Sequence, residues 1–473
     1  MRLTFYGGAG KVTGSNFLIE GKKGKVLVDC GLEQGADFSA ESVYGPFSYD
    51  PSTIDALVVT HAHLDHIGRI PKLVKDGFAG SIFMTPATRD LAALILEDSV
   101  GILGEDAKRR SLPPLYTESD LAHALTLVEA LDYHTEREVA PGLSAYLYNT
   151  GHILGSACVR IQDESGAALA LTGDIGNSPS PLLPDFEPIT DADALVMESV
   201  YGDRVHPAQK RRTELLGEVL AQAIAKKGAI LIPAFSMERT QLMLYELSNF
   251  FAAGTLPKVP VYLDSPLAIK VTSVYEKWAR LAEAPAKRGP TYFKSAARDE
   301  MKREGSLFNF PFLTKTMRRE ESVEIEKTPN PKIIIAGAGM SHGGRIGRWE
   351  AKYLPDPKTT LVIVGYQAPG SPGRHLAEGE KRVRLGGSWV ENRATVEILD
   401  GWSAHADRDG LLDFAHAALE GKRTKVIFTA LGEPAVSRFL AQRIHDYLGA
   451  RAVAPTEGEI WEITRDSAER ISQ

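Results

Sequence analysis

The chain has 473 residues, 43% of them hydrophobic and 24% charged, and a formal net charge of −7. This is the composition of an ordinary globular protein, and such a length exceeds a single hydrophobic core, so we expect two domains. No run approaches the ~20 apolar residues that span a bilayer, which excludes a membrane-spanning helix. The negative charge does not indicate a nucleic-acid-binding protein, nor does it exclude one, because local patches matter more than totals.

The two cysteines, Cys30 and Cys158, argue against a disulfide framework and fit a reducing compartment. Neither has the spacing of a thiolate metal site, so we interpret both as small buried side chains. The N-terminal residues enter a strand-like pattern directly and lack the apolar segment of a signal peptide. We therefore expect a cytoplasmic protein that does not contact a membrane.

Up to residue 205, short apolar runs alternate with glycine turns, which predicts a region rich in strands. The clearest of these strands are predicted at 17–20, 25–29, 56–60, 145–148, 157–161 and 168–172. Between them, residues 86–103 place Leu91, Leu94 and Ile95 on one apolar face, which predicts a helix.

From Pro207 onward helices and strands alternate, the pattern of an α/β unit with a parallel sheet. Helices are predicted at 210–225, 237–251 and from 265, and strands at 229–232, 259–263, 332–336 and 360–364. The C-terminal part has predicted strands at 394–398, 425–429 and 459–463 and helices at 407–419 and 434–448. We expect a first domain at 1–205, an inserted domain at 206–378, and a return to the first domain at 379–473.

The densest chemical signal is the segment His61-Ala62-His63-Leu64-Asp65-His66, directly after the apolar run Ile54–Val59. Three of the chain's 12 histidines fall within these six residues, at a strand end that opens into a loop, where functional sites are usually built. Imidazole nitrogen and carboxylate oxygen are ligands of Zn²⁺. Four such donors are too many for one ion with an open position, so the segment predicts a site shared by two ions.

Four further side chains stand at strand ends or in turns and are candidates to complete the metal site. They are Asp29, His152, Asp174 and His405. Each alone is weak evidence, because a lone aspartate at a strand end more often caps a turn and a lone histidine is more often packed. Their recurrence alongside the six-residue segment favours one shared site, completed by a residue more than 300 positions downstream.

This arrangement resembles the metallo-β-lactamase fold: the segment at 61–66 is preceded by Asp29 and followed by His152 and Asp174. Further segments are similar to the β-CASP branch of that family, which includes ribonuclease J and the endonuclease subunit of the pre-mRNA cleavage and polyadenylation machinery. These segments are 197–202, 232–235, 239–241, 264–268, 339–345, 370–375 and 403–407. The resemblance covers essentially the whole chain in order.

The resemblance implies an α/β fold class, an αββα sandwich interrupted by an α/β cap domain with a parallel sheet. It also implies two zinc ions with Asp174 bridging them and Asp29 orienting the ligands without touching metal. The remaining ligands are His61, His63 and His152 for one ion and Asp65, His66 and His405 for the other. The implied partner is RNA, with single strands favoured, and a homodimer is left open.

Two divalent ions about 3.5–4 Å apart activate a shared water and stabilise both the attacking and the leaving oxygen of an in-line displacement. The chain would thus hydrolyse RNA, internally or from the 5′ end, and leave 5′-phosphate and 3′-hydroxyl ends. Asp65 would position the water and accept its proton. Glu198 would polarise His375, which would protonate the leaving oxygen.

The inserted domain supplies candidates for holding phosphate. The glycine-rich stretch 337–345 follows a predicted strand and precedes a helix, so its backbone N–H groups can face an anion. An ordinary tight turn and surface salt bridges are the alternatives for these residues. The candidates are Arg239, Gly343, Gly344, Arg345, Ser371 and Arg374.

Three other functions compete with RNA hydrolysis. In the family, histidine at the position of His405 goes with RNA-directed members and valine with DNA-directed ones, so His405 favours RNA. A hydrolase of small molecules would not need the inserted domain. A noncatalytic scaffold would have lost ligands, whereas all seven implied ligands are present. The sequence preference of the substrate and the mode of cleavage are not predicted.

Overall fold

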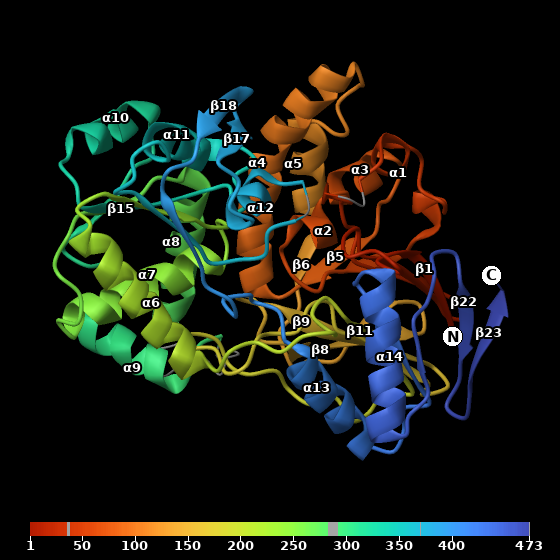
Figure 1. The fold of residues 1–473 in the computed structure, drawn as a ribbon. Coiled ribbons are helices and arrows are strands. Elements are labelled where there is room, and N and C mark those ends of the chain that lie inside the picture. The colour runs from red at the N-terminus through yellow and green to blue at the C-terminus, as the bar shows by residue number, and fades with distance from the viewer. Residues whose placement is uncertain (36–37, 282–291, 369, 473) are drawn as a thin grey trace. The chain divides into compact units, whose positions relative to one another are not determined.

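The computed structural model describes residues 1–35, 38–281, 292–368 and 370–472, and the chain forms two compact units (Figure 1). The first unit comprises residues 1–205 and 405–473, together with Tyr292. The second comprises the described residues of 206–287 and residues 293–404. No helix within the described ranges is long and apolar enough to cross a membrane.

The first unit is built on two β-sheets. The eight-stranded sheet has the order β23 (Ala468–Ser472), β22 (Ile460–Ile463), β1 (Arg2–Gly7), β2 (Asn16–Glu20), β3 (Lys25–Val28), β4 (Ala56–Val58), β5 (Ser81–Met84) and β6 (Val128–Ala130). The seven-stranded sheet has the order β21 (Ala452–Val453), β20 (Val426–Ala430), β11 (Ala194–Glu198), β10 (Ala168–Leu171), β9 (Ala157–Asp163), β8 (Leu143–Asn149) and β7 (Arg137–Ala140). Both sheets mix parallel and antiparallel pairs.

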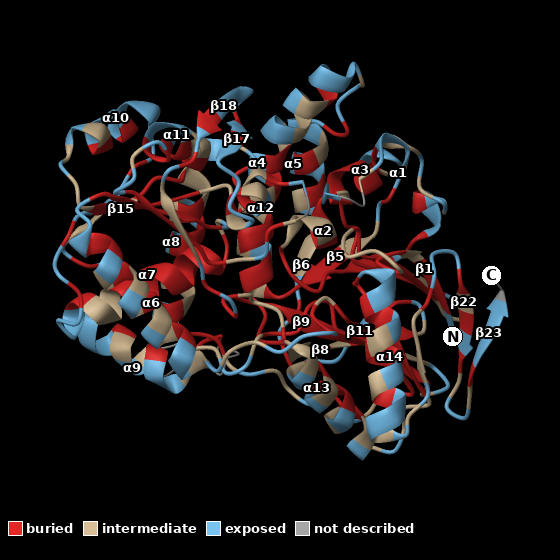
Figure 2. Ribbon diagram, viewed as in Figure 1, coloured by how far each residue is buried: buried red, intermediate tan, exposed pale blue. Residues whose placement is uncertain are grey.

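The two sheets pack face to face through aromatic side chains. The ring of Phe5 on β1 meets that of Phe428 on β20 with centroids 5.4 Å apart, and Trp461 on β22 lies 4.8 Å from Phe428. Strands β11 and β20 are buried along their whole length, which is typical of central strands covered on both faces, and Figure 2 shows β11 among buried residues.

Helices cover the outer faces of this sandwich. Leu411 and Phe414 of α13 (Arg408–Glu420) and Leu440 of α14 (Pro434–Leu448) pack on Leu195 and Ile427 of the seven-stranded sheet. The helices before residue 127 are α1 (Ala40–Tyr44), the 3₁₀ turn Pro51–Thr53, α2 (Leu64–Ile67), α3 (Ile70–Lys75), α4 (Pro86–Arg110) and α5 (Glu118–Thr126). The predicted αββα sandwich is confirmed.

The second unit contains a six-stranded sheet in which every neighbouring pair is parallel. Its order is β14 (Leu313–Lys315), β13 (Val261–Leu263), β15 (Lys332–Ala336), β12 (Ala229–Pro233), β16 (Thr360–Ile363) and β19 (Thr395–Ile398). The helices are α6 (Gln209–Ala225), α7 (Arg239–Ala252), α8 (Pro266–Leu281), α9 (Ser295–Glu304), α10 (Arg319–Lys327), α11 (Gly344–Tyr353) and α12 (Pro372–Ala377). The parallel sheet predicted for the inserted domain is therefore present.

The second unit continues beyond residue 378, where we expected the first domain to resume. Strand β19 pairs in parallel with β16, so the predicted strand at 394–398 is an edge strand of the second unit's sheet. The hairpin of β17 (Arg382–Leu385) and β18 (Ser388–Glu391) buries Val383 and Val390 in the same core as Leu376. These contacts move the return to the first unit from residue 379 to His405.

The loops of the first unit that carry the predicted metal ligands follow the carboxyl ends of its strands. Asp29 directly follows β3, and Asp174 comes shortly after β10. His152 lies in the turn between β8 and β9. Both cysteines are buried and free, and burial raises the pKa of the Cys30 thiol to about 12, as expected of inert side chains.

Candidate metal centre

The segment at 61–66 forms a tight turn that holds its histidines in the interior of the first unit. Strand β4 ends at Val58, and the backbone N–H of His66 donates to the carbonyl of His63 at the start of the short helix α2. The side chain of His61 is fully buried and that of His66 nearly so. Three imidazoles are thus presented on one side of a single loop.

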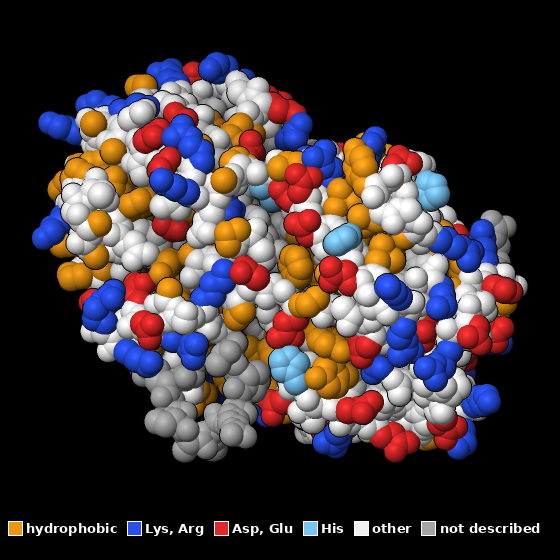
Figure 3. All heavy atoms as spheres, turned by 90° about the horizontal axis from the view of Figure 1, so that it is seen from below, with side chains coloured by type: hydrophobic (Ala, Val, Ile, Leu, Met, Phe, Trp, Pro, Cys, Tyr) orange, Lys and Arg blue, Asp and Glu red, His pale blue; other side chains and the backbone are white. Residues whose placement is uncertain are grey.

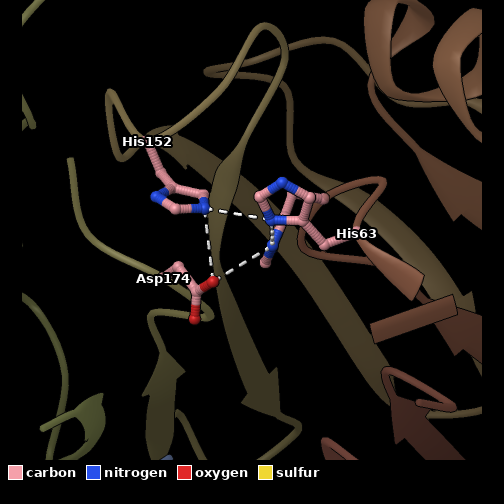
Figure 4. A group of neighbouring side chains, drawn as sticks. His63, His152 and Asp174 are labelled. Atoms are coloured by element: carbon pink, nitrogen blue, oxygen red, sulfur yellow. Dashed lines mark hydrogen bonds and ion pairs between the residues drawn. The ribbon is translucent and has the colours of Figure 1, made fainter. Parts of the chain in front are cut away.

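Two imidazoles face one carboxylate oxygen, Oδ2 of Asp174, and a third imidazole contacts both of them. The Nε2 atoms of His61 and His152 lie 3.2 and 3.3 Å from it. Nδ1 of His63 lies 3.0 Å from Nε2 of His61 and 3.1 Å from Nε2 of His152. All four ligand atoms lie within 4.8 Å of one another, and Figure 4 shows the His152 ring facing both Asp174 and His63.

The protonation of this group fits a metal ion better than a hydrogen-bonded cluster. Burial lowers the pKa of His61, His63 and His152, with further lowering from their histidine neighbours, so the rings are held neutral. Each neutral ring keeps a lone pair, and each metal-ligating histidine must be in that form. Three imidazole nitrogens and a carboxylate are a donor set that Zn²⁺ accepts.

Asp174 also belongs to a second group of donors. The ligand atoms of Asp174, Glu198 and His405 lie within 4.8 Å of one another. Oδ1 of Asp174 lies 3.5 Å from Nε2 of His66, and its Oδ2 lies 3.9 Å from Nδ1 of His405. One carboxylate therefore stands between two sets of imidazoles.

Charged neighbours stabilise this second group despite its burial. Burial would lower the pKa of His405, but the carboxylates of Glu198 and Asp174 outweigh it and raise the pKa to about 9. Burial likewise opposes protonation of His66, yet Asp174 and Asp29 raise its pKa well above the ordinary value. A cation at this position would replace the positive charge that these protons supply.

Asp65 adds negative charge near the second group. Among the described residues, however, its carboxylate belongs to neither of the two groups of close donor atoms. Its carboxyl is buried, and burial raises its pKa, while His66 lowers it and Asp174 raises it further. Asp65 also helps to raise the pKa of His405. The carboxylate that is grouped with His405 and Asp174 is instead that of Glu198.

Glu198 holds the far downstream His405 against the loop of Asp174. Its Oε2 lies 3.0 Å from Nδ1 of His405, and its Oε1 accepts a hydrogen bond from the backbone N–H of Ile175 at 2.5 Å. Gly176 and His405 form an antiparallel bridge, which adds a backbone link. We expected Glu198 to pair with His375; each of its carboxylate oxygens can accept a second hydrogen bond, so this pairing stays a prediction.

Asp29 occupies a strained backbone position and orients His66. Its φ of 59° is unusual for a residue other than glycine. Oδ1 accepts from the backbone N–H of Thr60, and Oδ2 accepts from the hydroxyls of Ser15 and Thr60 at 2.8 and 2.9 Å. Oδ2 also lies 2.7 Å from Nδ1 of His66, which leaves Nε2 of that ring directed at Asp174.

His375 lies in the second unit, on α12, and is half-exposed. Its Nδ1 pairs with Oε1 of Glu380 at 2.8 Å, and the backbone N–H of Glu380 donates to the carbonyl of His375. The nearby Arg374 donates from Nε to Glu378 at 2.6 Å, and Ser371 caps α12 by accepting from the N–H of Arg374. Sequence reasoning missed Glu380, because a surface glutamate five residues from a histidine is common.

Arg345 makes several contacts within the second unit. Its guanidinium donates to Asp264 Oδ1 at 2.6 Å and to the carbonyls of Thr316 and Met317. We expected it to bind phosphate; these contacts involve Nη1 and one N–H of Nη2, and phosphate binding stays a prediction. The guanidinium is drawn inward because the buried carboxylate of Asp264 needs a cation.

The glycine-rich stretch turns sharply between β15 and α11. A Cβ on Gly344 would lie 2.4 Å from the carbonyl oxygen of Gly337, and the φ of Gly344 is 62°, so only glycine fits there. Gly343, with φ of 154°, has open space around its Cα.

Arg239, another expected phosphate contact, begins α7 and is buried.

On the face shown in Figure 3, basic and acidic side chains are interspersed, and neither sign gathers over an extended described area. This agrees with the net charge of −7. Contacts to an anionic polymer on such a surface must come from particular groups rather than from a broad basic patch.

Comparison with known proteins matches the chain to three family descriptions. Residues 9–233 match the metallo-beta-lactamase superfamily, residues 240–376 the Beta-Casp domain, and residues 389–455 the Zn-dependent metallo-hydrolase RNA specificity domain. The first two matches follow one another along the chain in the order that the resemblance implied.

Several curated proteins are similar over most of their length. Ribonuclease TTHA0252 of Thermus thermophilus is 35% identical over 414 residues, which are 88% of this chain and 90% of that protein. An RNase J-like protein of Methanocaldococcus jannaschii is 31% identical over 463 residues, 97% of this chain and 99% of its own. Transcription termination factor FttA of Methanosarcina mazei is 31% identical over 473 residues, 97% of this chain and 71% of its own.

A solved structure has the same overall fold. It is a protein of unknown function from Enterococcus faecalis V583, with a TM-score of 0.56 and 12% identity, covering 98% of this chain and 99% of that one.

The family match and the cluster of metal donors together define a metal-dependent hydrolase. Within that class, the chain belongs to the β-CASP branch of the metallo-β-lactamase superfamily.

Proposed function

We propose that this protein is a zinc-dependent ribonuclease that hydrolyses RNA phosphodiester bonds. The observation that carries the proposal is the buried convergence of His61, His63 and His152 on Asp174. The 35% identity to a protein named a ribonuclease and the match of residues 389–455 to an RNA specificity domain support RNA as the substrate.

Two groups of ligands share Asp174 in this proposal. They are His61, His63 and His152 for one Zn²⁺ ion, and Asp65, His66 and His405 for the other. When bound, the two ions supply Lewis-acid stabilisation and make water nucleophilic near neutral pH. Imidazole and carboxylate donors without thiolate fit a hydrolytic rather than a purely structural zinc site.

The protein's own side chains prepare the ligands and move the proton. Glu198 accepts a hydrogen bond from Nδ1 of His405, so the other ring nitrogen, Nε2, carries the lone pair that a metal ion needs. Asp29 does the same for His66. Asp65 positions the attacking water and accepts its proton, and burial, which raises the pKa of this carboxyl, makes it a stronger base.

His375 is the proposed proton donor to the leaving 3′-oxygen. Its ring is half-exposed and so accessible to a substrate, and Glu380 holds Nδ1, which leaves Nε2 to deliver the proton. Attack by water with this leaving group gives 5′-phosphate and 3′-hydroxyl ends. Phosphate oxygens are held by backbone N–H groups and guanidinium groups. The proposed contacts are Arg239, Gly343, Gly344, Arg345, Ser371 and Arg374.

The proposal is tested by digestion of one end-labelled sequence supplied as RNA and as DNA. The chelated chain should be inactive, zinc should restore cleavage of RNA, and His63→Ala should not be restored. His416→Ala is the matched control, because His416 is an exposed helical histidine of the same unit. Cleavage of RNA that persists in chelator, or an active His63→Ala chain, would contradict the proposal.

The mode of cleavage is measured in the same digestion. Circular RNA is cut only by an endonuclease, and RNAs with 5′-phosphate or 5′-triphosphate ends report dependence on the end. If circular RNA is not cleaved and linear RNA releases mononucleotides, the protein acts as a 5′→3′ exonuclease. Preferential cleavage of the DNA form would replace RNA by DNA as the substrate.

A further inference from the structure

Two large aromatic side chains are exposed at the carboxyl edge of the parallel sheet in the second unit. Phe235 follows β12 and is 40% exposed, and Tyr366 follows β16 and is 45% exposed. Strands β12 and β16 are hydrogen-bonded neighbours, so the two residues leave the sheet side by side. This edge is where parallel α/β sheets usually bind ligands.

Glycines create the space in which the Phe235 ring lies. A Cβ on Gly339, in the loop after β15, would lie 2.7 Å from Cδ2 of Phe235, so any larger residue would displace the ring. A Cβ on Gly365, next to Tyr366, would lie 3.8 Å from Cε2 of the same ring. The ring thus rests on backbone on one side while much of it faces solvent.

Hydrogen bonds hold the backbone around the two aromatic residues in place before any ligand arrives. The carbonyl of Phe235 accepts from the N–H and the hydroxyl of Thr240, the latter at 2.7 Å. The buried side-chain amide of Gln367 donates to the carbonyls of Gly339 and Gly365 at 3.0 and 3.2 Å. The loops after β15 and β16 are therefore tied together next to the two aromatic residues, which lowers the entropy lost on binding.

A cation lies beside this pair. The guanidinium carbon and Nε of Arg239 are both 3.9 Å from the position of a Cβ on Gly365, the residue between the strand end and Tyr366. The proposed phosphate-contacting glycines, Gly343 and Gly344, belong to the same loop as Gly339. Flat apolar rings next to a positive charge and backbone N–H groups match a nucleotide, which has a flat base and an anionic phosphate.

We propose that Phe235 and Tyr366 form a stacking platform for the bases of the RNA substrate. The platform rests on the proposed ribonuclease function and adds the means by which the substrate is gripped without base-specific hydrogen bonds. Stacking on aromatic rings tolerates any sequence, because every base has a π face. It also selects single strands, whose bases are free to leave their own stack.

The test is single-turnover cleavage with the zinc-loaded full chain in excess over labelled single-stranded RNA. Phe235→Leu and Tyr366→Leu keep apolar volume but remove the ring, and each should raise the half-saturating protein concentration roughly 5- to 100-fold. The maximal rate should stay at the wild-type value. Phe235→Tyr and Tyr366→Phe keep a ring and should behave as wild type.

Trp389→Leu is the matched control, because Trp389 is an aromatic of the same unit that is 62% exposed and lies on the β17–β18 hairpin. It should leave both kinetic constants unchanged.

A substrate series with one abasic nucleotide at successive positions should weaken wild-type binding at particular positions. The Phe235→Leu, Tyr366→Leu double variant should lose that positional dependence.

Each other outcome overturns the platform. An unchanged half-saturating concentration in a folded Phe235→Leu chain would do so, as would an equal effect of Trp389→Leu. If Phe235→Leu and Tyr366→Leu sediment differently from wild type while their RNA cleavage kinetics are unchanged, the two rings belong to a contact between protein chains instead. Wild-type protein that fails to cleave RNA would overturn the ribonuclease function as well, whereas normal wild-type cleavage with unaffected variants would overturn the platform alone.

Discussion

Asp174 in the first unit and Asp264 in the second are both buried aspartates placed just after a strand, yet their surroundings differ in kind. Oδ2 of Asp174 faces the nitrogens of His61 and His152, whose rings burial keeps neutral. Asp264 instead receives hydrogen bonds from donors that carry their own protons. These donors are the hydroxyls of Thr316 and Ser322, the guanidinium of Arg345 and the indole N–H of Trp349.

The difference shows what separates a metal site from a structural carboxylate. The donors around Asp264 complete its hydrogen bonding, so the site needs nothing further. The neutral rings of His61, His63 and His152 keep lone pairs near Asp174 that a cation can accept. Glu350 on α11 is intermediate, since it is fully buried and its Oε1 accepts one hydrogen bond from the hydroxyl of Ser341.

Removing Asp174 should have the largest effect. Asp174→Ala takes away the carboxylate that both ligand groups share, so we expect loss of detectable RNA cleavage together with loss of bound zinc. The measurement is metal content per chain alongside cleavage of labelled RNA. Asp264→Ala serves as the comparison, and zinc retained at wild-type stoichiometry in Asp174→Ala would contradict the shared role.

Changing Asp264 should affect folding rather than metal binding. Asp264→Asn leaves the partly buried guanidinium of Arg345 without its carboxylate, which costs roughly 3 kcal/mol of unfolding free energy. Zinc content of the folded chain should be unchanged. Urea unfolding with a probe in the second unit measures this, and a variant as stable as wild type would show that Asp264 does not anchor Arg345.

Glu198→Gln should have a moderate effect on the metal centre. The amide keeps the shape but removes the charge that fixes the ring of His405, so zinc affinity or cleavage should fall roughly 10- to 100-fold. Competition with a zinc chelator measures the affinity. Glu246→Gln, a buried glutamate of the second unit, is the control, and an equal loss in both variants would contradict a specific role for Glu198.

The smallest effect is expected from Glu350→Gln, and it depends on pH. Burial raises the pKa of Glu350 to about 7, above its ordinary value of 4.5, so the folded state holds this proton more tightly than the unfolded state. Stability from Glu350 is therefore full below pH 4.5 and is lost as pH rises through about 7.

The glutamine side chain of this variant cannot ionise, so above pH 7 its free energy of unfolding should exceed that of wild type by on the order of 1 kcal/mol. The difference stays this small because the ionised wild-type carboxylate can relax toward water. Thermal unfolding at pH 5 and pH 8 measures the difference. The two proteins should differ little at pH 5. Identical pH dependence in both would show that Glu350 stays protonated or is solvated throughout.

Much of the fold could be predicted because periodicity is local. Alternating strand and helix patterns after Pro207 identified a parallel sheet, and the strand before His61 was evident from its apolar run. The strand at 394–398 was located correctly but assigned to the wrong unit. Its own residues do not specify which sheet it joins; pairing with β16 decides that.

The site was predictable in its residue types and not in its pairings. His61, His63, His152 and Asp174 stand out because imidazoles and strand-end carboxylates are rare together. The partner of Glu198 depends on where the chain returns, 207 positions later, to bring His405 beside Ile175. The structural role of Arg345 likewise depends on Asp264, 81 positions away, being buried beside it.

The central claim is that the donors around Asp174 bind two zinc ions that make the chain a ribonuclease. Its most direct test is a titration of the chelated chain with Zn²⁺, in which ions bound per chain and the rate of cleavage of labelled RNA are measured on the same samples. We predict that cleavage appears with the bound metal and reaches its maximum at two ions per chain. Full cleavage before any zinc is bound, or none when two ions are bound, would contradict the account.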